Sequence, residues 1–588
     1  MGQIHTNSPA GPRCCQKVRF GNIGLEGHAS LLHFVLKMVF FGCILSLDVP
    51  GISYAGSPHT GAGITRSEQK LIDAARRGGM ASYVTGRAAN DDPSKGSNWD
   101  AERTIRADVI KRLVTAINLE WPVYSNRIVV LGARITGQLD LSQADLKYEL
   151  VIAKSFFDQP IVLRDATAHS ISLDGSYVTD IGRIFTAFQP SEPVSLFADG
   201  LRVNGTLNLS NFRGKGSVRL AQANISGDLY LRGSNIENGG GTAVEASAVA
   251  VGGNVYLDDG FRAAGTVDLS QAEIGHELRC SGGTFESRHD DALSACYIRV
   301  RGNVALTQDF SATGGVCLVG AEIAGDLDCR GGTFRAREVE TAGSALDLEQ
   351  AQISKTLFIS HMVPDGILNL SYAHARVLSD DADSWPANGK LELEGFSYDQ
   401  IASVSPSDPQ SRLTWLARQP SNHFSTLPYQ QLAKTFRDAG EEDSAKSILI
   451  GMEDARWQYG KLDLWERCWN WTTWLTIGYG YSPGRALIFI IAFVILGTVV
   501  FWWGHKIGAI TPTDNDELSH CQPFNCFVYS LETFLPLVEL GQAKHWRPDS
   551  QDSISGRRLR VYLWGHIMLG WFFTSMLVVA ITGLVRST

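Results

Sequence analysis

Short segments in which apolar and polar residues alternate recur along the middle of the chain. The segment 225–231 is repeated at 274–280 and again at 323–329, so each copy begins 49 residues after the last. Alternate apolar positions separated by glycine-rich turns are typical of short strands that wind around a core and stack coil on coil. The pattern predicts a mainly β fold, a parallel β-helix over residues 126–400, with about two coils in each 49-residue repeat.

The spacing of the strands separates this fold from other all-β folds. Successive strand motifs begin 12, 11 and 26 residues apart, a rhythm that a β-sandwich or a propeller would not keep. Glycines before the strands are expected to supply left-handed corners. Cys280 and Cys329 occupy one position in two repeats, about 10 Å apart at ~4.8 Å per coil. This is too far for a disulfide, so both are expected to be free core thiols. Cys317 alternates outward and Cys296 lies in a turn-like segment, and the pattern makes no prediction about the pairing of either.

Residues 1–55 predict an export leader. The apolar run from Met38 to Leu47 has the length of a signal-peptide core, and Ser53 and Ala55 place small residues at a cleavage site. An uncleaved anchor is the alternative, because the stretch before the run is long unless a later start codon is used. Residues 56–125 predict an N-terminal helical cap.

Two long apolar segments near the C-terminus predict a membrane domain over residues 476–588. Residues 486–503 carry no charge, and residues 561–585 are interrupted only by His566. Each segment is long enough to cross the ~30 Å hydrocarbon core of a bilayer. Residues 401–475 predict a helical adapter followed by a tryptophan-rich approach, which is typical of a membrane interface. Membrane lipid is therefore an expected partner.

One segment before the first span resembles the carbonyl-lined filter of potassium channels in its order of residues. Thr476, Gly478, Tyr479 and Gly480 stand in the order Thr-Ile-Gly-Tyr-Gly. A filter lies between two spans behind a pore helix, whereas this segment precedes the first span. The position favours an interfacial turn that leads into the span, with the filter as the alternative.

The loop between the two spans is a stronger pore candidate. Residues 523–541 predict a short helix that is broken at Pro536 and continues as an apolar segment. A helix too short to cross, followed by an extended turn, is the layout of a re-entrant loop. Glu532, Glu539 and Gln542 would then line a pore if several subunits converged. The alternative is an interfacial helix whose carboxylates lie among the headgroups.

Basic residues predict the orientation of the membrane domain. The positive-inside rule places the loop in the cytoplasm, because the loop carries six basic residues, namely Lys506, Lys544, Arg547, Arg557, Arg558 and Arg560. The β-helix would then lie in the periplasm and the spans in the inner membrane of a bacterium, in agreement with an export leader. Cys521 and Cys526 would stay reduced in this topology, whereas the opposite topology would allow them to pair.

Several motifs together resemble a family of uncharacterised bacterial membrane proteins. They are WDAERTIRADVIKRLV from Trp99, VVLGARITGQLDLSQADL from Val129, GYGYSPGRAL from Gly478 and FVYSLETFLPLVELGQ from Phe527. The repeats are similar to pentapeptide-repeat and bactofilin-type β-helices. The resemblance implies a β-helix joined to a two-span membrane domain, and no established reaction. Some relatives carry an oxidoreductase label, which no dinucleotide fingerprint, CxxC or haem motif in this sequence supports.

Composition and motifs narrow the classes of function. The chain has 588 residues and a net charge of −9, which disfavours nucleic acid as a partner. The carboxylate pair Asp258 and Asp259, and the group 289–291, are of the kind that polysaccharide lyases and hydrolases use, but such turns suit solvated carboxylates equally well. The sequence contains no P-loop, GxSxG or HExxH motif, and we expect no metal or cofactor.

Three hypotheses follow from these features. The leading one is a non-enzymatic, membrane-anchored periplasmic scaffold or binding module, with an envelope polymer or a protein as partner. The second is a pore-loop ion channel with a β-helical sensor domain, assembled as a homo-oligomer. The third is a carbohydrate-active enzyme.

Overall fold

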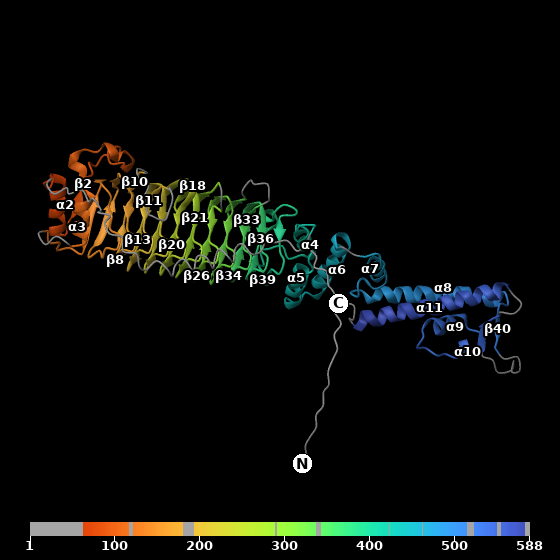
Figure 1. Cartoon of the computed structure of the whole chain (residues 1–588). Helices are drawn as coiled ribbons and strands as arrows, with labels where there is room; N and C mark the ends of the chain where they lie inside the picture. Colours follow the sequence, from red (N-terminus) through yellow and green to blue (C-terminus); the bar gives the residue numbers. More distant parts are fainter. Residues whose placement is uncertain are drawn as a thin grey trace, which may run out of the picture. The chain divides into compact units, whose positions relative to one another are not determined.

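The computed structural model describes residues 63–116, 121–179, 193–288, 291–336, 343–422, 424–460, 463–513, 523–549 and 554–582. The predicted leader lies outside these residues, as do His289, Asp290 and Cys521. The described chain comprises a β-solenoid, a group of helices that follows it in sequence and a C-terminal helical part (Figure 1). Each is described by itself.

The central region is a parallel β-solenoid of about 11 turns, which confirms the predicted parallel-helical β fold. Among the described residues its strands form two sheets, and neighbouring strands pair in parallel. The first sheet contains β1 (Met80–Ser82), β3 (Arg127–Leu131), β5 (Glu149–Ala153), β8 (Thr167–Ala168), β9 (Ile171–Ser172), β12 (Arg202–Val203), β13 (Leu207–Asn208), β16 (Asn224–Ile225), β17 (Leu229–Tyr230), β19 (Ala250–Val251), β20 (Val255–Tyr256), β22 (Glu273–Ile274), β23 (Leu278–Arg279), β26 (Arg299–Val300), β27 (Val304–Ala305), β30 (Glu322–Ile323), β31 (Leu327–Asp328), β34 (Gln352–Phe358), β37 (His374–Ser379) and β39 (Ser397–Ile401).

The second sheet contains β2 (Thr104–Arg106), β4 (Arg134–Thr136), β6 (Phe156–Phe157), β7 (Ile161–Val162), β10 (Tyr177–Val178), β11 (Val194–Phe197), β14 (Arg213–Lys215), β15 (Ser217–Arg219), β18 (Asn235–Glu245), β21 (Arg262–Asp268), β24 (Thr284–Glu286), β25 (Leu293–Ser294), β28 (Ser311–Thr313), β29 (Val316–Cys317), β32 (Thr333–Arg335), β33 (Ser344–Asp347), β35 (Val363–Asp365), β36 (Ile367–Asn369) and β38 (Leu391–Glu392).

The strand register converts the alternating sequence pattern into a core and a surface. In the first sheet Ile225 pairs with Val251, Val251 with Ile274, Ile274 with Val300, and Val300 with Ile323. All five side chains are buried, and the positions that precede them are exposed or half-buried. Side chains alternate across a strand, so the apolar residues of each strand point into the coil.

Glycines serve close stacking of the turns as well as corners. Gln222 and Gln271 occupy equivalent corners with left-handed φ values of 57° and 60°, so the expectation that glycines supply the corners is wrong at these positions. Gly252 and Gly275 instead lie where two turns approach closely. A Cβ atom on Gly275 would lie 2.1 Å from the carbonyl oxygen of Gly252, which leaves no room for any other residue.

An aromatic stack runs through several turns of the core. Phe261, Phe285, Phe310 and Phe334 follow one another with ring centroids 5.2, 5.2 and 5.3 Å apart. All four rings are fully buried. Each turn therefore places one ring on the next, and the stack couples neighbouring turns by dispersion and by tilted ring contacts.

The cysteines of the solenoid are of two kinds. Cys280 and Cys329 are fully buried and free, as the sequence predicts. Burial raises the pKa of both thiols, which makes them unreactive. Cys296 and Cys317, whose pairing the sequence leaves open, form a disulfide with Cα atoms 5.6 Å apart.

Helices flank the solenoid in the sequence. Before it come α2 (Arg66–Arg77) and α3 (Ala107–Val114), together with short 3₁₀ segments at Pro93–Asn98 and Ala101–Arg103. The segment 56–125 contributes strands as well as helices, because β1 and β2 pair with β3 and β4. After the solenoid come a 3₁₀ segment at Ala382–Ser384, α4 (Pro409–Leu416), α5 (Leu427–Asp438) and α6 (Glu442–Tyr459).

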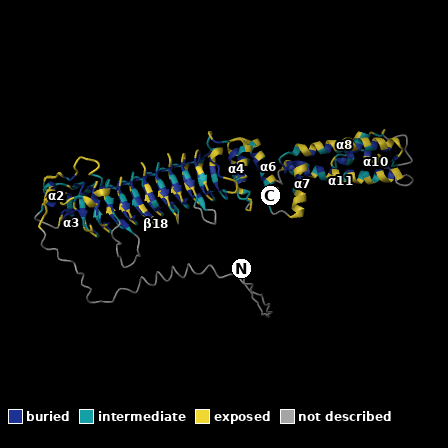
Figure 2. Ribbon diagram, turned by 90° about the horizontal axis from the view of Figure 1, so that it is seen from above, coloured by how far each residue is buried: buried dark blue, intermediate teal, exposed yellow. Residues whose placement is uncertain are grey.

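The C-terminal part is helical. It contains α7 (Leu464–Ile477), α8 (Pro483–Lys506), α9 (Cys526–Phe534), α10 (Gln542–His545) and α11 (Ile554–Thr582), with an antiparallel pair of β40 (Ile510–Pro512) and β41 (Trp546–Pro548). Among the described residues, α8 and α11 are the two helices long and apolar enough to cross a membrane, and they cover most of the predicted spans. Figure 2 shows exposed residues along both helices.

Candidate functional sites

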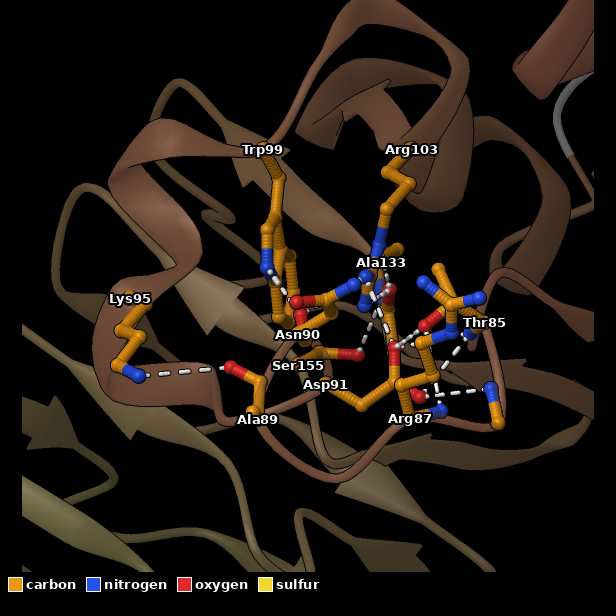
Figure 3. Close-up of polar contacts among 12 residues, drawn as sticks. Thr85, Arg87, Ala89, Asn90, Asp91, Lys95, Trp99, Arg103, Ala133 and Ser155 are labelled. Carbon is orange, nitrogen blue, oxygen red and sulfur yellow. Dashed lines mark hydrogen bonds and ion pairs between the residues drawn. The ribbon is translucent and has the colours of Figure 1, made fainter.

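A polar cluster in the N-terminal region of the solenoid surrounds Arg103 (Figure 3). The guanidinium lies 3.7 Å from the ring centroid of Trp99 and donates to the carbonyl oxygens of Gly132 and Asn90. It also donates to the Asp91 carboxylate at 3.0 Å, which accepts further hydrogen bonds from the loop before it. These contacts occupy the donors of Arg103, so the cluster fastens a loop to the first turns and presents no open site.

The carboxylate pair Asp258 and Asp259 lies beside Arg232. The guanidinium approaches Asp258 at 3.1 Å, without the alignment of a hydrogen bond, and Asp259 at 3.5 Å. It also lies 4.1 Å from the ring centroid of Tyr256, which stacks on Tyr230 with centroids 4.8 Å apart. Burial raises the pKa of the Asp258 carboxyl. Both carboxylates share one cation, which is the arrangement of an ion-pair network.

A groove of about 600 Å³ crosses consecutive turns of the first sheet. Its walls include small residues such as Ser226 and Gly252 together with Arg299 and Arg301. Arg299 pairs with Glu273 at 3.3 Å, whereas Arg301 makes no ion pair with any residue that the structure describes. The groove therefore offers an unpaired guanidinium and backbone polar groups to an elongated polar ligand.

The filter-like residues lie at the end of α7 and in the turn after it. Thr476 is helical, and its hydroxyl donates to a carbonyl oxygen one turn earlier at 2.7 Å. Gly478, Tyr479 and Gly480 have left-handed φ values of 54°, 56° and 86°, and the Tyr479 hydroxyl donates to Asp454 of α6 at 3.2 Å. The carbonyl groups of this segment thus follow a helix end and a tight turn.

The loop candidates Glu532 and Gln542 lie together, and Glu539 lies apart from them. The Glu532 carboxylate accepts hydrogen bonds from the backbone N–H groups of residues 541–543 at 3.1, 2.7 and 3.0 Å. The Gln542 side chain bonds to backbone groups just before α9. Glu539 is exposed and pairs with Lys544 at 3.0 Å. Glu532 therefore holds the returning chain against the last turn of α9, Gln542 holds it against the residues before α9, and Glu539 faces outward.

A buried polar contact between α9 and the two long helices is absent from the sequence predictions. The Ser530 hydroxyl donates to the carbonyl oxygen of Val494 in α8 at 2.8 Å and lies 3.3 Å from Nε2 of His566 in α11. Gly497 makes room for this contact, because a Cβ atom there would lie 2.3 Å from the Ser530 hydroxyl. In the sequence, the residue that points to this contact is His566, which interrupts the second apolar segment.

Neither a metal-binding group nor a similar protein identifies the function of these sites. Among the described residues, no three His, Cys, Asp or Glu side chains gather in a group that would hold a metal ion. Comparison with protein-family models, curated proteins and solved structures finds no match. The functional inference therefore rests on the geometry of the chain itself.

Proposed function

We propose that this protein is a membrane-anchored scaffold or binding module of the bacterial envelope, with its β-solenoid in the periplasm and its C-terminal helices in the inner membrane. The observation that carries the proposal is the presence in one chain of a disulfide-linked solenoid and two apolar helices. Disulfides persist in the oxidising periplasm and are rare in the cytosol, which supports this sidedness.

Side-chain exposure in the C-terminal part supports the anchoring. Ile488 of α8 and Met568 of α11 are exposed along helices that have the length of a membrane span. Trp465, Trp469 and Trp471 of α7 are exposed as well. Tryptophan is enriched among lipid headgroups because its ring is apolar and its N–H is polar, so we place α7 at the membrane surface.

We further infer that the repeat unit of the solenoid is 49 residues wound into two coils. Ile225, Ile274 and Ile323 are spaced at this interval. In the ladder they alternate with Val251 and Val300, one strand pairing at a time. Each step of 49 residues therefore crosses two pairings, which supports a two-coil unit.

The groove that contains Arg301 is the surface that we assign to partner binding, and an anionic envelope polymer fits its chemistry. Co-sedimentation of the detergent-solubilised full-length protein with purified peptidoglycan sacculi tests this assignment. We expect Arg301→Glu to lower the bound fraction several-fold. Arg262→Glu changes an exposed arginine of the second sheet, outside the groove, and should leave the bound fraction unchanged. Equal binding of both variants and the unsubstituted protein would refute the groove as the binding surface.

Reporter fusions test the topology. A cytoplasmic reporter and a periplasmic reporter are each inserted between residues 514 and 520, in the loop between the two apolar helices. We expect activity from the cytoplasmic reporter alone. Activity of the periplasmic reporter would place the loop outside and the solenoid in the cytoplasm, which contradicts the proposal.

A pore is the second candidate function, and the position of α9 favours it. The short helix packs against both long helices through Phe534, which joins an apolar cluster with Val494 and Phe573. Planar-bilayer recordings of the purified protein test this function. Glu539→Gln is the sharper variant, because Glu539 is exposed whereas Glu532 is bonded to the backbone. A cation current that Glu539→Gln abolishes would establish the pore, and the absence of any current would remove it.

A further inference from the structure

We propose that the non-helical segment 535–540 is the surface through which copies of this chain assemble in the membrane. The proposal rests on the membrane anchoring proposed above and adds the partner that covers the loop.

The segment begins near the middle of the two long helices. Ser530 in α9 donates to the carbonyl oxygen of Val494, which lies at the middle of α8 (Pro483–Lys506). The last residue of α9, Phe534, meets α11 at Gly570, where a Cβ atom would lie 1.8 Å from the Phe534 carbonyl oxygen. When α8 and α11 cross a bilayer, the chain after Phe534 therefore starts at mid-depth and returns toward the surface from which α9 entered.

This returning chain is non-helical and only partly covered. It makes a turn in which the Val538 N–H donates to the Leu535 carbonyl oxygen at 3.1 Å, and Leu535, Pro536 and Val538 are half-buried. The Leu537 side chain is 84% exposed and that of Leu540 is 45% exposed. Among the described residues, the backbone N–H groups of Leu537, Glu539 and Leu540 find no acceptor. Non-helical backbone at membrane depth is tolerated only where protein covers it or where it lines a water-filled cavity. A single copy provides neither arrangement at Leu537, Glu539 and Leu540, which are exposed.

A second copy of the chain is the occupant that these features favour. Every copy carries the same partly covered segment, so a closed ring of identical subunits covers all of them at once, as cyclic homo-oligomers do. The segment also carries its own charge complementarity. Glu539 and Lys544 lie exposed beside it and pair at 3.0 Å, and neighbouring copies in a ring present the same opposite charges to each other. The segments of all copies would then surround a common axis.

Cysteine cross-linking of the full-length protein in native membranes tests the proposal. The background carries serine in place of the cysteines outside the solenoid. Leu537→Cys is the test variant and Met568→Cys the matched control. Met568 is 73% exposed, and it lies two residues from His566, on the opposite side of α11 from α9. Oxidation is expected to convert most of the Leu537→Cys protein to covalent dimers and to leave Met568→Cys monomeric.

The results that would contradict the assembly differ from those that would contradict the membrane anchoring. Equal cross-linking of the two variants, or a Leu537→Cys protein that stays monomeric, would overturn the proposal, and so would a cross-link to a protein of different mass. Native mass spectrometry of the unsubstituted protein in lipid nanodiscs gives an independent readout, in which a multiple of the chain mass is expected and a single-chain mass contradicts the proposal. Loss of the protein from the membrane fraction would refute the anchoring itself, whereas a monomer within the membrane refutes only the assembly.

Discussion

The solenoid and the C-terminal helical part differ in the kind of residue that they expose. In the solenoid the core is apolar, with rings such as Phe285 and Phe310 fully buried. In the C-terminal part the two long helices expose apolar residues such as Ile488 and Met568, and Ser530, Glu532 and His566 are buried beside an apolar cluster. The first arrangement suits water, and the second suits lipid, where each backbone and side-chain polar group needs a partner within the protein. The comparison supports the proposal that the solenoid lies in water and the C-terminal helices lie in a membrane.

The largest effect is expected in the solenoid core. Phe310→Ala removes one ring from the aromatic stack and leaves a cavity, which we expect to cost about 3–5 kcal/mol of local unfolding free energy. Native-state hydrogen exchange of the strands on either side measures it. Val363→Ala, at an exposed strand position, is the control and should change exchange little. Equal effects of the two substitutions would mean that the stack does not couple the turns.

In the helical part we expect a loss of stability when a methyl group is added between α9 and α11. Gly570→Ala places a methyl group against the Phe534 carbonyl oxygen, 1.8 Å from the ideal Cβ position, and should destabilise the packing of α9 by about 1–3 kcal/mol. Gly565→Ala on the same helix meets nothing within 4 Å and is the matched control. Unfolding of the purified protein in mixed micelles compares them. If Gly570→Ala left the free energy of unfolding unchanged, α9 would not pack against α11.

The two loop carboxylates, Glu532 and Glu539, allow the effect of removing a buried charge to be compared with the effect of removing an exposed one. Glu532→Gln removes the charge that three backbone N–H groups share, with an expected cost of about 1–3 kcal/mol. Glu539→Gln alters an exposed ion pair, which contributes little to stability. Protease sensitivity of the loop in liposomes provides the measurement. If proteases cleaved the Glu539→Gln variant faster than the Glu532→Gln variant, Glu539 and not Glu532 would be the carboxylate that stabilises the loop.

The smallest expected effect is a pH dependence in the N-terminal region. Burial opposes ionisation of Glu68, but hydrogen bonds from Arg106 and from the backbone of Thr65 outweigh it and hold the pKa below its ordinary value. The stabilisation is therefore present above the ordinary pKa of a glutamate and is lost as the pH falls through the lowered pKa. Hydrogen exchange of α2 between pH 6 and pH 3 follows it, and Glu68→Gln should show no such dependence.

The sequence predicts those features that depend on regular spacing. The repeats at Ile225, Ile274 and Ile323 predict the solenoid, because an apolar residue at every second position can be buried only on one face of a strand. Long apolar runs similarly predict α8 and α11. The free thiols of Cys280 and Cys329 follow from the same stacking geometry.

Contacts between residues that are distant in sequence and lie in irregular segments cannot be predicted from regular spacing. Cys296 and Cys317 pair because two turns bring a corner beside a strand end, and the strand pattern does not fix where a corner residue points. The Arg103 cluster and the contact of Ser530 with His566 likewise depend on how a loop or a short helix docks. Glu532 is predicted as a pore candidate from its type and position, but its hydrogen bonds to residues 541–543 depend on the path of the returning chain.

Thiol trapping in intact cells tests the sidedness of the solenoid most directly. Cells are quenched in acid, and the protein is unfolded and treated with a maleimide that adds mass to each free thiol, before or after reduction. The account predicts that Cys296 and Cys317 react only after reduction, whereas Cys280 and Cys329 react without it, because the proposed function places the solenoid in an oxidising compartment. Reaction of Cys296 and Cys317 without reduction would place the solenoid in a reducing compartment and contradict the central claim.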